Sequence, residues 1–495
     1  MIAELERLSH LGEELARRAR AAGVLMIWRV QSRSVRRIVV RQGKTEGTSI
    51  SSSSGHGVQI ATDDGRTALA SRDDLRPEAA LKLLDRAVEV ASRTARLGVA
   101  AGELPGCLPL CDRAVPGNPQ AFSEIDLQRV GRRLVELESR IAAEVRGVQL
   151  RLNFRAELDA WRVFRDDGTD VLFAMPRCTL GLRATGVGDG ARHGVSTSVF
   201  SPDPGLPWDD IAVERFLQRA RGAARLAVEL PDAPAHPPGS FPLVIDYALA
   251  KGLAHEAFGH AAEADGFRSS VLAEKGRFRF GAEVGAGHVS IVDEPVPDDH
   301  AWQPFSANGV RRERVVIVDH GRLSAGLSDL WSAGPGGVRL TGAGRAESFH
   351  QAPQPRMTNI RIEIDDPLPA PGEFEEYGPE EVRDLLQQAG VFRRHPQVCF
   401  LSGYSGGQVN PTSGDFVFNC KAIYVLGEGA TAMHKPAIFS GSMFGALHAV
   451  REGFGPLKLD ALGHCGKWGQ SVPSSGGSHY FLVLDPDPTV RLGGS

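Results

Sequence analysis

Two periods of apolar residues run through the first half of the chain, one typical of helices and one typical of strands. From Ile2 to Leu15 the apolar side chains recur every three or four residues, which predicts an amphipathic helix over residues 2–22. Glu, Ala, Leu and Arg at helical spacing predict three further helices, over residues 76–98, 123–145 and 208–228. Strand-like runs lie between the helices: Val24–Val30, Arg36–Arg41, Val148–Arg155, Thr179–Ala184 and Val195–Phe200. This order predicts an α+β fold, with helices packed against a largely antiparallel sheet.

The first strand-like runs are rich in arginine. Between Arg29 and Arg41 the arginines alternate with Val and Ile, which indicates a half-buried strand with a charged outer face rather than a surface for nucleic acid. Shortly after it, Ser51–Ser54 and Gly55 predict a flexible turn or loop, which is too short to link independent domains.

The clearest break in the pattern is the segment Pro231–Pro242, whose sequence is PDAPAHPPGSFP. Because prolines cannot continue a helix, the main domain boundary is expected here. The predicted organisation is an N-terminal α+β region at residues 1–230, a Pro-rich linker at 231–242 and a β-rich C-terminal domain at 243–495.

Strand patterns dominate beyond this boundary. Leu243–Ile245 is expected to form a short buried strand that leads into a helix at the start of the C-terminal domain. Val315–Asp319 and Arg322–Leu327 predict a hairpin, and Asn359–Ile364 alternates apolar and polar residues as a strand does. One late helix is expected around Gly445–Glu452.

Composition and charge narrow the class of protein. The 495 residues are 42% hydrophobic and 23% charged, an ordinary balance for a globular protein, and a net charge of -4 gives no reason to expect direct contact with nucleic acid. The N-terminal sequence shows neither an apolar signal-peptide region nor a small-residue cleavage site, and no apolar run is long enough to predict a membrane span. Because the six cysteines are sparse for this length, a cytoplasmic protein is expected.

The candidate chemistry lies in residues 253–265, LAHEAFGHAAEAD. Neutral imidazoles are good zinc ligands, and a glutamate beside one can take a proton from water without binding the metal itself. His255 and His260 are five residues apart, however, so an ideal helix would aim them about 140° apart. A π-like turn, eased by Gly259, would bring them to one face. Otherwise the two histidines are structural.

A catalytic zinc ion usually takes three protein ligands. Glu263, three residues after His260, is one candidate for the third ligand, and a remote Cys or His is another. In the segment Gly463–Lys467, small residues flank Cys465 and would let a thiolate approach a metal closely, and His464 lies beside it. Cys465 could equally be a small buried apolar residue. The residues alone leave this choice open.

Four separated blocks resemble the TldD/PmbA family of metalloproteases, and specifically its metal-bearing TldD branch. They are LAHEAFGHAAEAD (253–265), PRMTN (355–359), GGQVNPTSGDFVF (406–418) and CGKWGQSVP (465–473). The resemblance implies that His255, His260 and Cys465 are the metal ligands and that Glu256 is the catalytic glutamate. It also implies a dimer, either homomeric or with a metal-free PmbA/TldE-like subunit, and a peptide substrate in an enclosed cavity.

The predicted function is that of a zinc-dependent peptidase, with one zinc ion per chain, that hydrolyses unfolded peptides or leader and precursor peptides. Two imidazoles and a thiolate favour zinc over other divalent metals. The alternative is a catalytically silent scaffold or a regulatory subunit of a protease heterodimer, although such a subunit would usually have lost Glu256 or a ligand. The roles of Arg345, Glu347 and Arg356 stay open between contacts to substrate and an internal ion-pair network.

Overall fold

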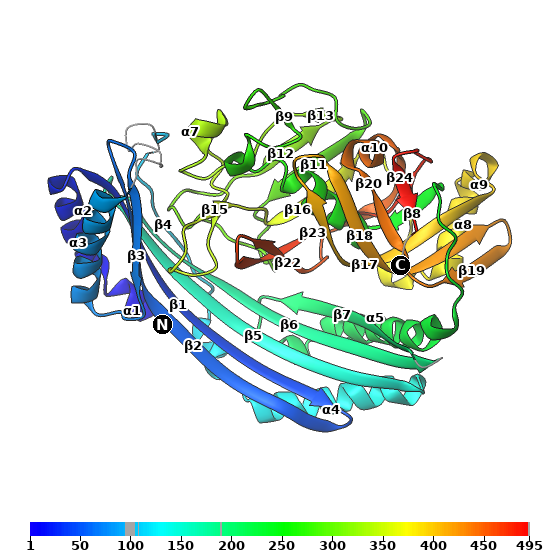
Figure 1. Cartoon of the computed structure of the whole chain (residues 1–495). Helices are drawn as coiled ribbons and strands as arrows, with labels where there is room; N and C mark the ends of the chain where they lie inside the picture. Colours follow the sequence, from blue (N-terminus) through cyan, green and yellow to red (C-terminus); the bar gives the residue numbers. More distant parts are fainter. Residues whose placement is uncertain (95–103, 107, 189–190, 494–495) are drawn as a thin grey trace.

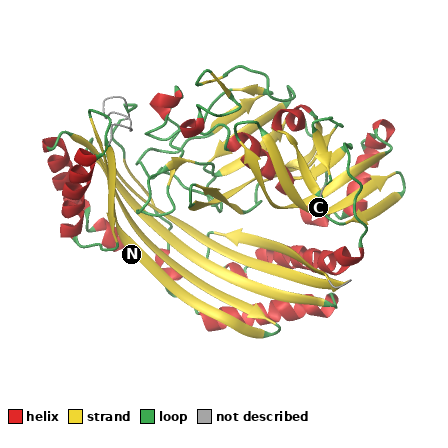
Figure 2. Ribbon diagram, in the orientation of Figure 1, coloured by secondary structure: helices red, strands yellow, loops and turns green. Residues whose placement is uncertain are grey.

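The computed structural model describes residues 1–94, 104–106, 108–188 and 191–493. These residues form two large β-sheets, one built from the first two hundred residues and the other from residue 243 onward (Figure 1). Figure 2 shows helices beside both sheets and a high strand content in the C-terminal part. The predicted α+β class with a β-rich C-terminal region is confirmed. No helix of the described residues is long and apolar enough to cross a membrane.

The first sheet is a long curved layer with strand order β3-β2-β1-β5-β6-β4, and β7 also pairs with β6. Its neighbouring strands are antiparallel except for β4 and β6, which are parallel. The strands are β1 Val24–Arg41, β2 Lys44–Thr62, β3 Thr67–Arg72, β4 Cys111–Ala114, β5 Val148–Arg165, β6 Asp170–Gly188 and β7 Ala191–Ser201.

The strands of this sheet are longer than the sequence patterns predict. The two runs expected around Arg29–Arg41 are a single strand, β1. Its predicted half-buried character with a charged outer face is only partly right, because Val24–Ser32 are almost all buried and Arg29 is 0% exposed, whereas the arginines from Arg33 onward are partly or fully exposed. The loop expected at Ser51–Ser54 is wrong, because these residues lie inside β2 and pair with β1, for example Ser51 with Val35. Serine side chains do not mark a strand, but the backbone there is hydrogen-bonded along its whole length, and that pairing depends on the neighbouring strand.

Helices cover one face of the first sheet, and the alternation of side chains decides which. Met26, Trp28 and Val30 point towards the helices and share a core with them, whereas Ile27 points to the opposite face. The helices are α1 Ile2–Glu6, α2 Ser9–Ala21, α3 Pro77–Arg93, α4 Leu127–Glu144 and α5 Asp210–Glu229. All four predicted helices are present, although the first is split in two, and residues 95–98 of the second lie outside the described residues.

The opposite face of the first sheet packs against the C-terminal part. Ile27, Trp161 and Phe173 form a small apolar cluster with Phe305 of the C-terminal part, and the rings of Phe173 and Phe305 are 5.8 Å apart. Along the chain, the strands of the first sheet precede the segment Pro231–Pro242 and those of the second sheet follow it. The domain boundary expected in that segment stays a prediction.

The second sheet follows the order β13-β12-β11-β16-β23-β8-β17-β18-β20-β24, with β19 paired to β18, and β21 and β22 paired to β23. Its strands are β8 Leu243–Asp246, β11 Val289–Glu294, β12 Val315–Asp319, β13 Arg322–Leu323, β16 Asn359–Ile364, β17 Gln397–Asn410, β18 Asp415–Gly427, β19 Ala430–His434, β20 Ile438–Ser442, β21 Val450–Lys458, β22 Gly463–Lys467, β23 Gln470–Leu484 and β24 Val490–Leu492. Two short pairs stand apart: β9 Ala273–Glu274 with β10 Arg277–Phe278, and β14 Gly344–Arg345 with β15 Gln354–Pro355.

Most of the strands predicted for this half are present. The hairpin of Val315–Asp319 and the strand Asn359–Ile364 are confirmed as β12 with β13 and as β16. The helix expected around Gly445–Glu452 is only partly right, because α10 (Met443–His448) ends early and β21 begins at Val450. The remaining helices are α6 Tyr247–Gly252, α7 Ala333–Gly336, α8 Pro379–Gln388 and α9 Val391–Arg394.

Strand β8 lies at the centre of this sheet, between β23 and β17, and all four of its residues are buried. The carboxylate of Asp246 at its end accepts hydrogen bonds from the backbone N–H groups of Ala248 (3.1 Å) and Leu249 (2.9 Å), which starts α6. The residues with candidate chemistry follow α6 directly. They are therefore anchored to a fully buried strand of the sheet.

Candidate metal centre and active site

The helix that follows α6 is widened by one residue per turn. Leu253–Gly259 form a π-helix, in which the N–H of His260 donates to the carbonyl of His255 at 3.2 Å. Side chains five residues apart therefore share a face, and the rings of His255 and His260 have centroids 5.2 Å apart. A β-carbon on Gly259 would lie 2.7 Å from the sulfur of Met357, so glycine permits the close packing of this turn. The π-like turn expected from the spacing is confirmed.

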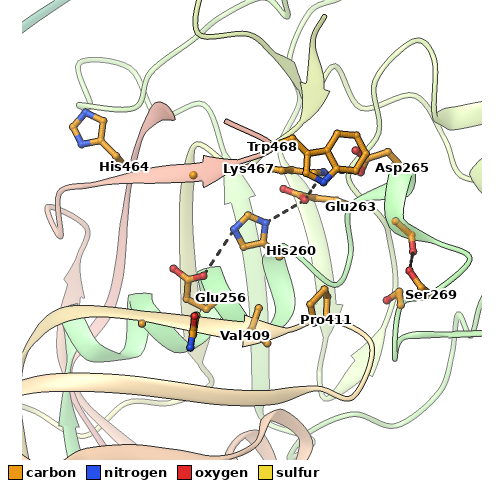
Figure 3. Close-up of a pocket in the computed structure, with 15 residues that line it drawn as sticks. Glu256, His260, Glu263, Asp265, Ser269, Val409, Pro411, His464, Lys467 and Trp468 are labelled. Atoms are coloured by element: carbon orange, nitrogen blue, oxygen red, sulfur yellow. Dashed lines mark hydrogen bonds and ion pairs between the residues drawn. The ribbon is translucent and has the colours of Figure 1, made fainter. Parts of the chain in front are cut away.

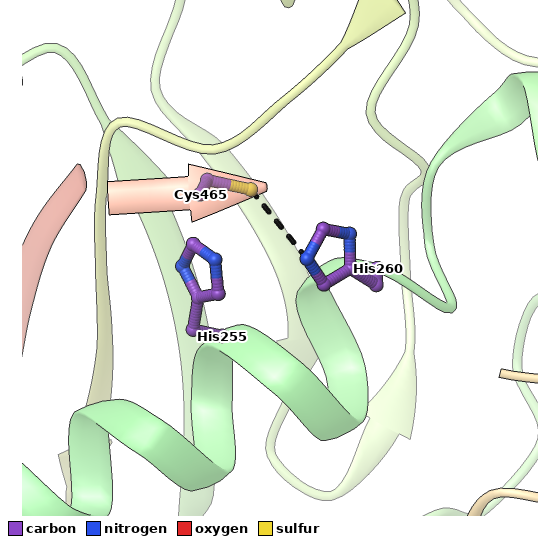
Figure 4. A group of neighbouring side chains, drawn as sticks. All are labelled: His255, His260 and Cys465. Carbon is purple, nitrogen blue, oxygen red and sulfur yellow. Dashed lines mark hydrogen bonds between the residues drawn. The ribbon is translucent and has the colours of Figure 1, made fainter. Parts of the chain in front are cut away.

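Cys465 meets the two histidines from a distant part of the chain. It lies on β22 with 1% of its surface exposed, and its Sγ is 3.5 Å from Nε2 of His260. One donor atom from each of His255, His260 and Cys465 lies within 4.8 Å of the others (Figure 4). Three residues that the sequence singled out are thus brought together with their donor atoms converging.

The other two candidates for the third ligand point elsewhere. Glu263 Oε2 is 3.2 Å from Nδ1 of His260, the ring nitrogen remote from Cys465, and 2.7 Å from Nζ of Lys467. A carboxylate in this position fixes the imidazole with Nε2 free for a metal, as the orienting partners of metal-bound histidines do. His464 precedes Cys465 on the strand and so projects to the opposite face, away from His260 (Figure 3).

The chemistry of this cluster fits a metal ion. Both ring nitrogens of His255 are buried without a hydrogen-bond partner, an arrangement that costs about 1–3 kcal/mol for a buried polar atom unless a ligand satisfies it. Burial, with Lys251 and His260 nearby, holds the pKa of His255 well below its usual value, so the ring is neutral and has a free lone pair. Two imidazoles and one sulfur are a common set of zinc ligands.

Cys465 is disposed to be a thiolate. Burial alone would raise the pKa of its thiol, but His260 and the guanidinium of Arg356 outweigh burial and lower it. Nε of Arg356 donates to Sγ of Cys465 at 3.2 Å, and the same guanidinium donates to the Cys465 carbonyl. The thiolate is the form that binds metals.

Glu256 lies beside the cluster at the edge of open space. Its Oε2 is 3.9 Å from Nε2 of His260, and its Oε1 accepts a hydrogen bond from the Tyr404 hydroxyl at 3.3 Å. Burial raises the pKa of Glu256 above its ordinary value, although His260, Lys251 and Tyr404 act in the other direction. A carboxylate with a raised pKa next to a metal-ligand set is suited to accept and return a proton.

The space in front of Glu256 is a cleft of about 530 Å³. Two hairpins enclose it: β17 with β18, represented by Val409 and Pro411, and β22 with β23, represented by Lys467 and Trp468 (Figure 3). Glu256 thus faces a cavity of the size that binds small ligands or a short stretch of peptide.

The residues whose roles the sequence left open are engaged inside the protein. Arg345 and Arg356 are 1% and 0% exposed. Nη1 of Arg345 donates to the carbonyls of Met357 (2.6 Å) and Pro473 (2.7 Å). Glu347 Oε2 accepts from the N–H of Ser471 at 2.7 Å. These contacts hold β22 and β23 in place, but they are hydrogen bonds with backbone groups rather than ion pairs, so the choice between an internal ion-pair network and contacts to substrate stays open.

Two residues of the site were missed by the sequence patterns. Lys467 bridges Glu263 and Asp265 at 2.7 Å each. Its position two residues after Cys465 on a strand places it on the same face, so strand alternation would have found it. Tyr404 comes from β17 and carries no sequence signal for its contact with Glu256, because that contact depends on tertiary packing.

Comparisons with known proteins agree with this picture. The model of the "PmbA/TldA metallopeptidase C-terminal domain" matches residues 238–462, and that of "PmbA/TldA metallopeptidase domain 1" matches residues 29–91. A metalloprotease of Archaeoglobus fulgidus is 35% identical over 264 residues, which cover 53% of this chain and 56% of that protein. A metalloprotease TldD homolog of Haemophilus influenzae is 31% identical over 277 residues, covering 54% and 53% of the two chains. The chain thus spans about half the length of the curated relatives it matches.

The fold also matches solved structures along nearly the whole chain. TldE from Thermococcus kodakarensis superposes with a TM-score of 0.75 and 15% identity, covering 99% of this chain and 100% of that one. A protein of Thermotoga maritima, described as a modulator of a DNA gyrase, gives a TM-score of 0.72 with 17% identity over 98% and 99% of the two chains. At these identities the likeness concerns the fold.

Proposed function

Because the chain belongs to the TldD/PmbA family of metallopeptidases, we propose that it is a zinc-dependent peptidase of the metal-bearing TldD branch. The observation that carries the proposal is the convergence of His255, His260 and Cys465 within 4.8 Å, with Glu256 beside them at the cleft. The curated relatives are named metalloproteases, which supports a peptidase role.

In this proposal His255, His260 and Cys465 hold one zinc ion per chain. The orphaned ring nitrogens of His255 and the thiolate character of Cys465 support this donor set. A bound zinc ion polarises a carbonyl oxygen and lowers the pKa of water towards neutrality. Glu263 fixes the imidazole of His260 in the tautomer that leaves Nε2 free.

Glu256 is the general base and acid of the proposed reaction. Its carboxylate takes a proton from the attacking water and returns it to the leaving amine of the cleaved peptide bond. The hydroxyl of Tyr404 holds the carboxylate in position and donates to its charged form. The raised pKa of Glu256 brings the group closer to the pH at which both transfers are efficient.

The substrate class follows from the shape and edges of the cleft. Among the described residues, β22 pairs only with β23, so its other edge is free to hydrogen-bond an extended peptide. Recognition of main chain reads little sequence, which suits unfolded peptides or leader and precursor peptides. A folded protein offers such a segment only where it has an exposed edge strand or an extended loop.

The working assembly in this proposal is a dimer, either of two copies or with a PmbA/TldE-like subunit, located in the cytoplasm. The likeness in fold to TldE is the support for such a partner. The alternative function, a catalytically silent scaffold or regulatory subunit, is less well supported, because Glu256 and the three candidate ligands are all retained.

Glu256→Gln tests the assignment. The substitution keeps the shape and the hydrogen bond to Tyr404 but removes the base, so we expect full zinc content with cleavage of an unfolded peptide reduced at least a hundredfold. Zinc is measured by mass spectrometry and cleavage by chromatography of the products. Cleavage at the wild-type rate would refute the role of Glu256.

A further inference from the structure

Trp468 lies in a tight turn, at a position where a tryptophan is unfavourable for the backbone. With Gly469 it forms the two-residue turn between β22 and β23, since Lys467 pairs with Gln470. Both turn residues have positive φ, 45° for Trp468 and 77° for Gly469. Asn, Asp and Gly are preferred in such a turn, and a bulky residue in the left-handed region is an outlier. Backbone strain of this kind often accompanies function.

The indole of Trp468 is also exposed, at 77%. It lies beside Asp265 and Lys467 at the rim of the catalytic cleft (Figure 3). Within the protein the ring lies near the Lys467 ammonium, whose Nζ is 5.5 Å from its centroid. An exposed tryptophan nevertheless contributes little to the core, and turn preference does not explain this residue. Its place at the rim of the cleft points to contact with a ligand.

A second pocket, of about 440 Å³, adjoins the cleft. Trp468 and Asp265 line both cavities, so the two are neighbours across these residues. The side chains of Phe267 and Trp331 face the second pocket together with Trp468, and prolines, including Pro353, complete its walls. Its lining is therefore mainly aromatic and apolar.

One carboxylate oxygen of each acidic residue in the second pocket has a partner, whereas Oδ2 of Asp265 is buried without one among the described residues. Asp265 accepts from Nζ of Lys467 at 2.7 Å. Oδ1 of Asp329 accepts from the backbone N–H groups of Trp331 (3.2 Å) and Ser332 (2.9 Å). Gln59, Thr67, Ser332 and Gln354 also line the pocket, but rings, prolines and alanines line the larger part of it. Three rings in one pocket offer an aromatic side chain several faces to pack against.

We propose that the second pocket is a binding subsite for one aromatic side chain of the peptide, and that Trp468 is the residue that determines this specificity. The inference rests on the proposed function, since the occupant is a residue of the same peptide that lies in the cleft. Main chain is held in the cleft and one aromatic ring stacks against Trp468, so the enzyme cuts near Phe, Tyr or Trp. The volume of the pocket accommodates such a ring.

The test uses a ten-residue host peptide of Gly, Ser and Ala that carries a single Phe at each position in turn. Binding is measured by calorimetry on zinc-loaded Glu256→Gln, and kcat/KM on the active enzyme. We expect the Phe peptide in the best register to bind roughly tenfold more tightly than the same peptide with Ala, because the ring is buried on binding. The active enzyme should show a similar ratio of kcat/KM.

Three variants separate the role of Trp468 from general effects. Trp468→Asn keeps a residue suited to the turn but removes the ring, and should bring the Phe-to-Ala ratio close to one. Trp468→Phe should restore most of the ratio. Phe280→Ala removes another exposed aromatic residue, 46% exposed and outside both pockets, and should leave the ratio as it is.

The outcomes distinguish this inference from the proposed function. Phe-selective binding that disappears in Trp468→Asn supports the subsite. If such binding is observed but no peptide is hydrolysed, only the peptidase assignment fails. Equal binding of Phe and Ala peptides, or a preference that survives in Trp468→Asn, would overturn the subsite and leave the peptidase intact. Tightest binding of a matching Lys peptide would overturn the aromatic assignment in favour of the carboxylates. Binding of no peptide at all would overturn both.

Discussion

Lys467 neutralises one buried carboxylate, Glu263, and one half-buried carboxylate, Asp265, beside the proposed metal centre. The substitution Lys467→Met tests how much this neutralisation contributes to stability. The Nζ of Lys467 is 2.7 Å from Glu263 and 2.7 Å from Asp265, and Glu263 is only 2% exposed. Methionine keeps most of the apolar stem but removes the charge. Glu263 then loses the cation that compensates its burial while it still orients His260.

The size of the effect follows from burial. Removing one partner of a buried ion pair costs about 3–5 kcal/mol, because the other charge is left buried without compensation. The side chain of Lys467 is 13% exposed, so water screens it in part, and we expect the lower end, about 3 kcal/mol at pH 7. The zinc affinity should fall roughly tenfold, since Glu263 is left less well fixed against His260.

The effect should depend on pH with a definite sign. Burial raises the pKa of Glu263, but His260 and Lys467 outweigh it and hold the pKa below the ordinary value of 4.5. A lowered pKa in the folded state contributes stability above the unfolded-state value and loses it as the pH falls through the folded-state value. The difference between wild type and Lys467→Met should therefore shrink as the pH falls below 4.5.

Urea unfolding of the metal-free protein, with and without the substitution, measures this difference. Arg17→Met is the matched control, because Arg17 pairs with Glu14 at 2.6 Å but is 67% exposed, and such an exposed pair contributes little to stability. Lys467→Met combined with Glu263→Gln should recover much of the loss, since the unpaired charge is gone. A Lys467→Met protein as stable as the Arg17→Met control at pH 7 would refute the reasoning.

Two further substitutions test the site and its scaffold. Tyr404→Phe removes the hydrogen bond to Glu256 at 3.3 Å. It should lower kcat about tenfold and leave the zinc content unchanged. An unchanged kcat in the peptide assay would show that Tyr404 does not position the Glu256 carboxylate. Gly259→Ala places a β-carbon 2.7 Å from the Met357 sulfur, and should destabilise the protein by about 1–3 kcal/mol in urea unfolding and weaken zinc binding. Gly222→Ala is the control for this substitution, because Gly222 lies in α5 and nothing lies within 4 Å of the added carbon. It should stabilise the protein slightly. If both substitutions changed stability and zinc binding equally, the role given to the π-helix would be contradicted.

Local patterns predicted the elements of the fold well where side chains alternate or recur clearly. The helices of the N-terminal half and the strand Asn359–Ile364 carry strong periods and are present. The serines of β2 carry none, and their strand exists because β1 lies alongside and offers backbone partners. β1 and β2 are consecutive strands joined at Gln42 and Gly43, and the serines lie opposite Ser32–Val35 of β1, a pairing that the serine side chains themselves do not indicate.

For the candidate site as well, local sequence patterns indicated some features, whereas others depend on contacts between distant parts of the chain. The five-residue spacing of His255 and His260 left two alternatives open, a widened turn that brings the rings to one face or two structural histidines, and the structure has the widened turn. The contribution of Cys465 was out of reach of spacing, since it lies 205 residues from His260 and meets it only through the packing of β22. The role of Arg356, whose guanidinium contacts that sulfur, could not be assigned from the sequence, because this contact also depends on tertiary packing.

The most direct test of the account measures zinc content by mass spectrometry together with cleavage of an unfolded peptide, for wild type, Cys465→Ala and Cys178→Ala. Cys178 is also buried, at 0% exposure, but lies in the first sheet. The account predicts about one zinc ion per chain and chelator-sensitive cleavage in wild type and Cys178→Ala, with both lost in Cys465→Ala. Full zinc content and undiminished cleavage in Cys465→Ala would contradict it.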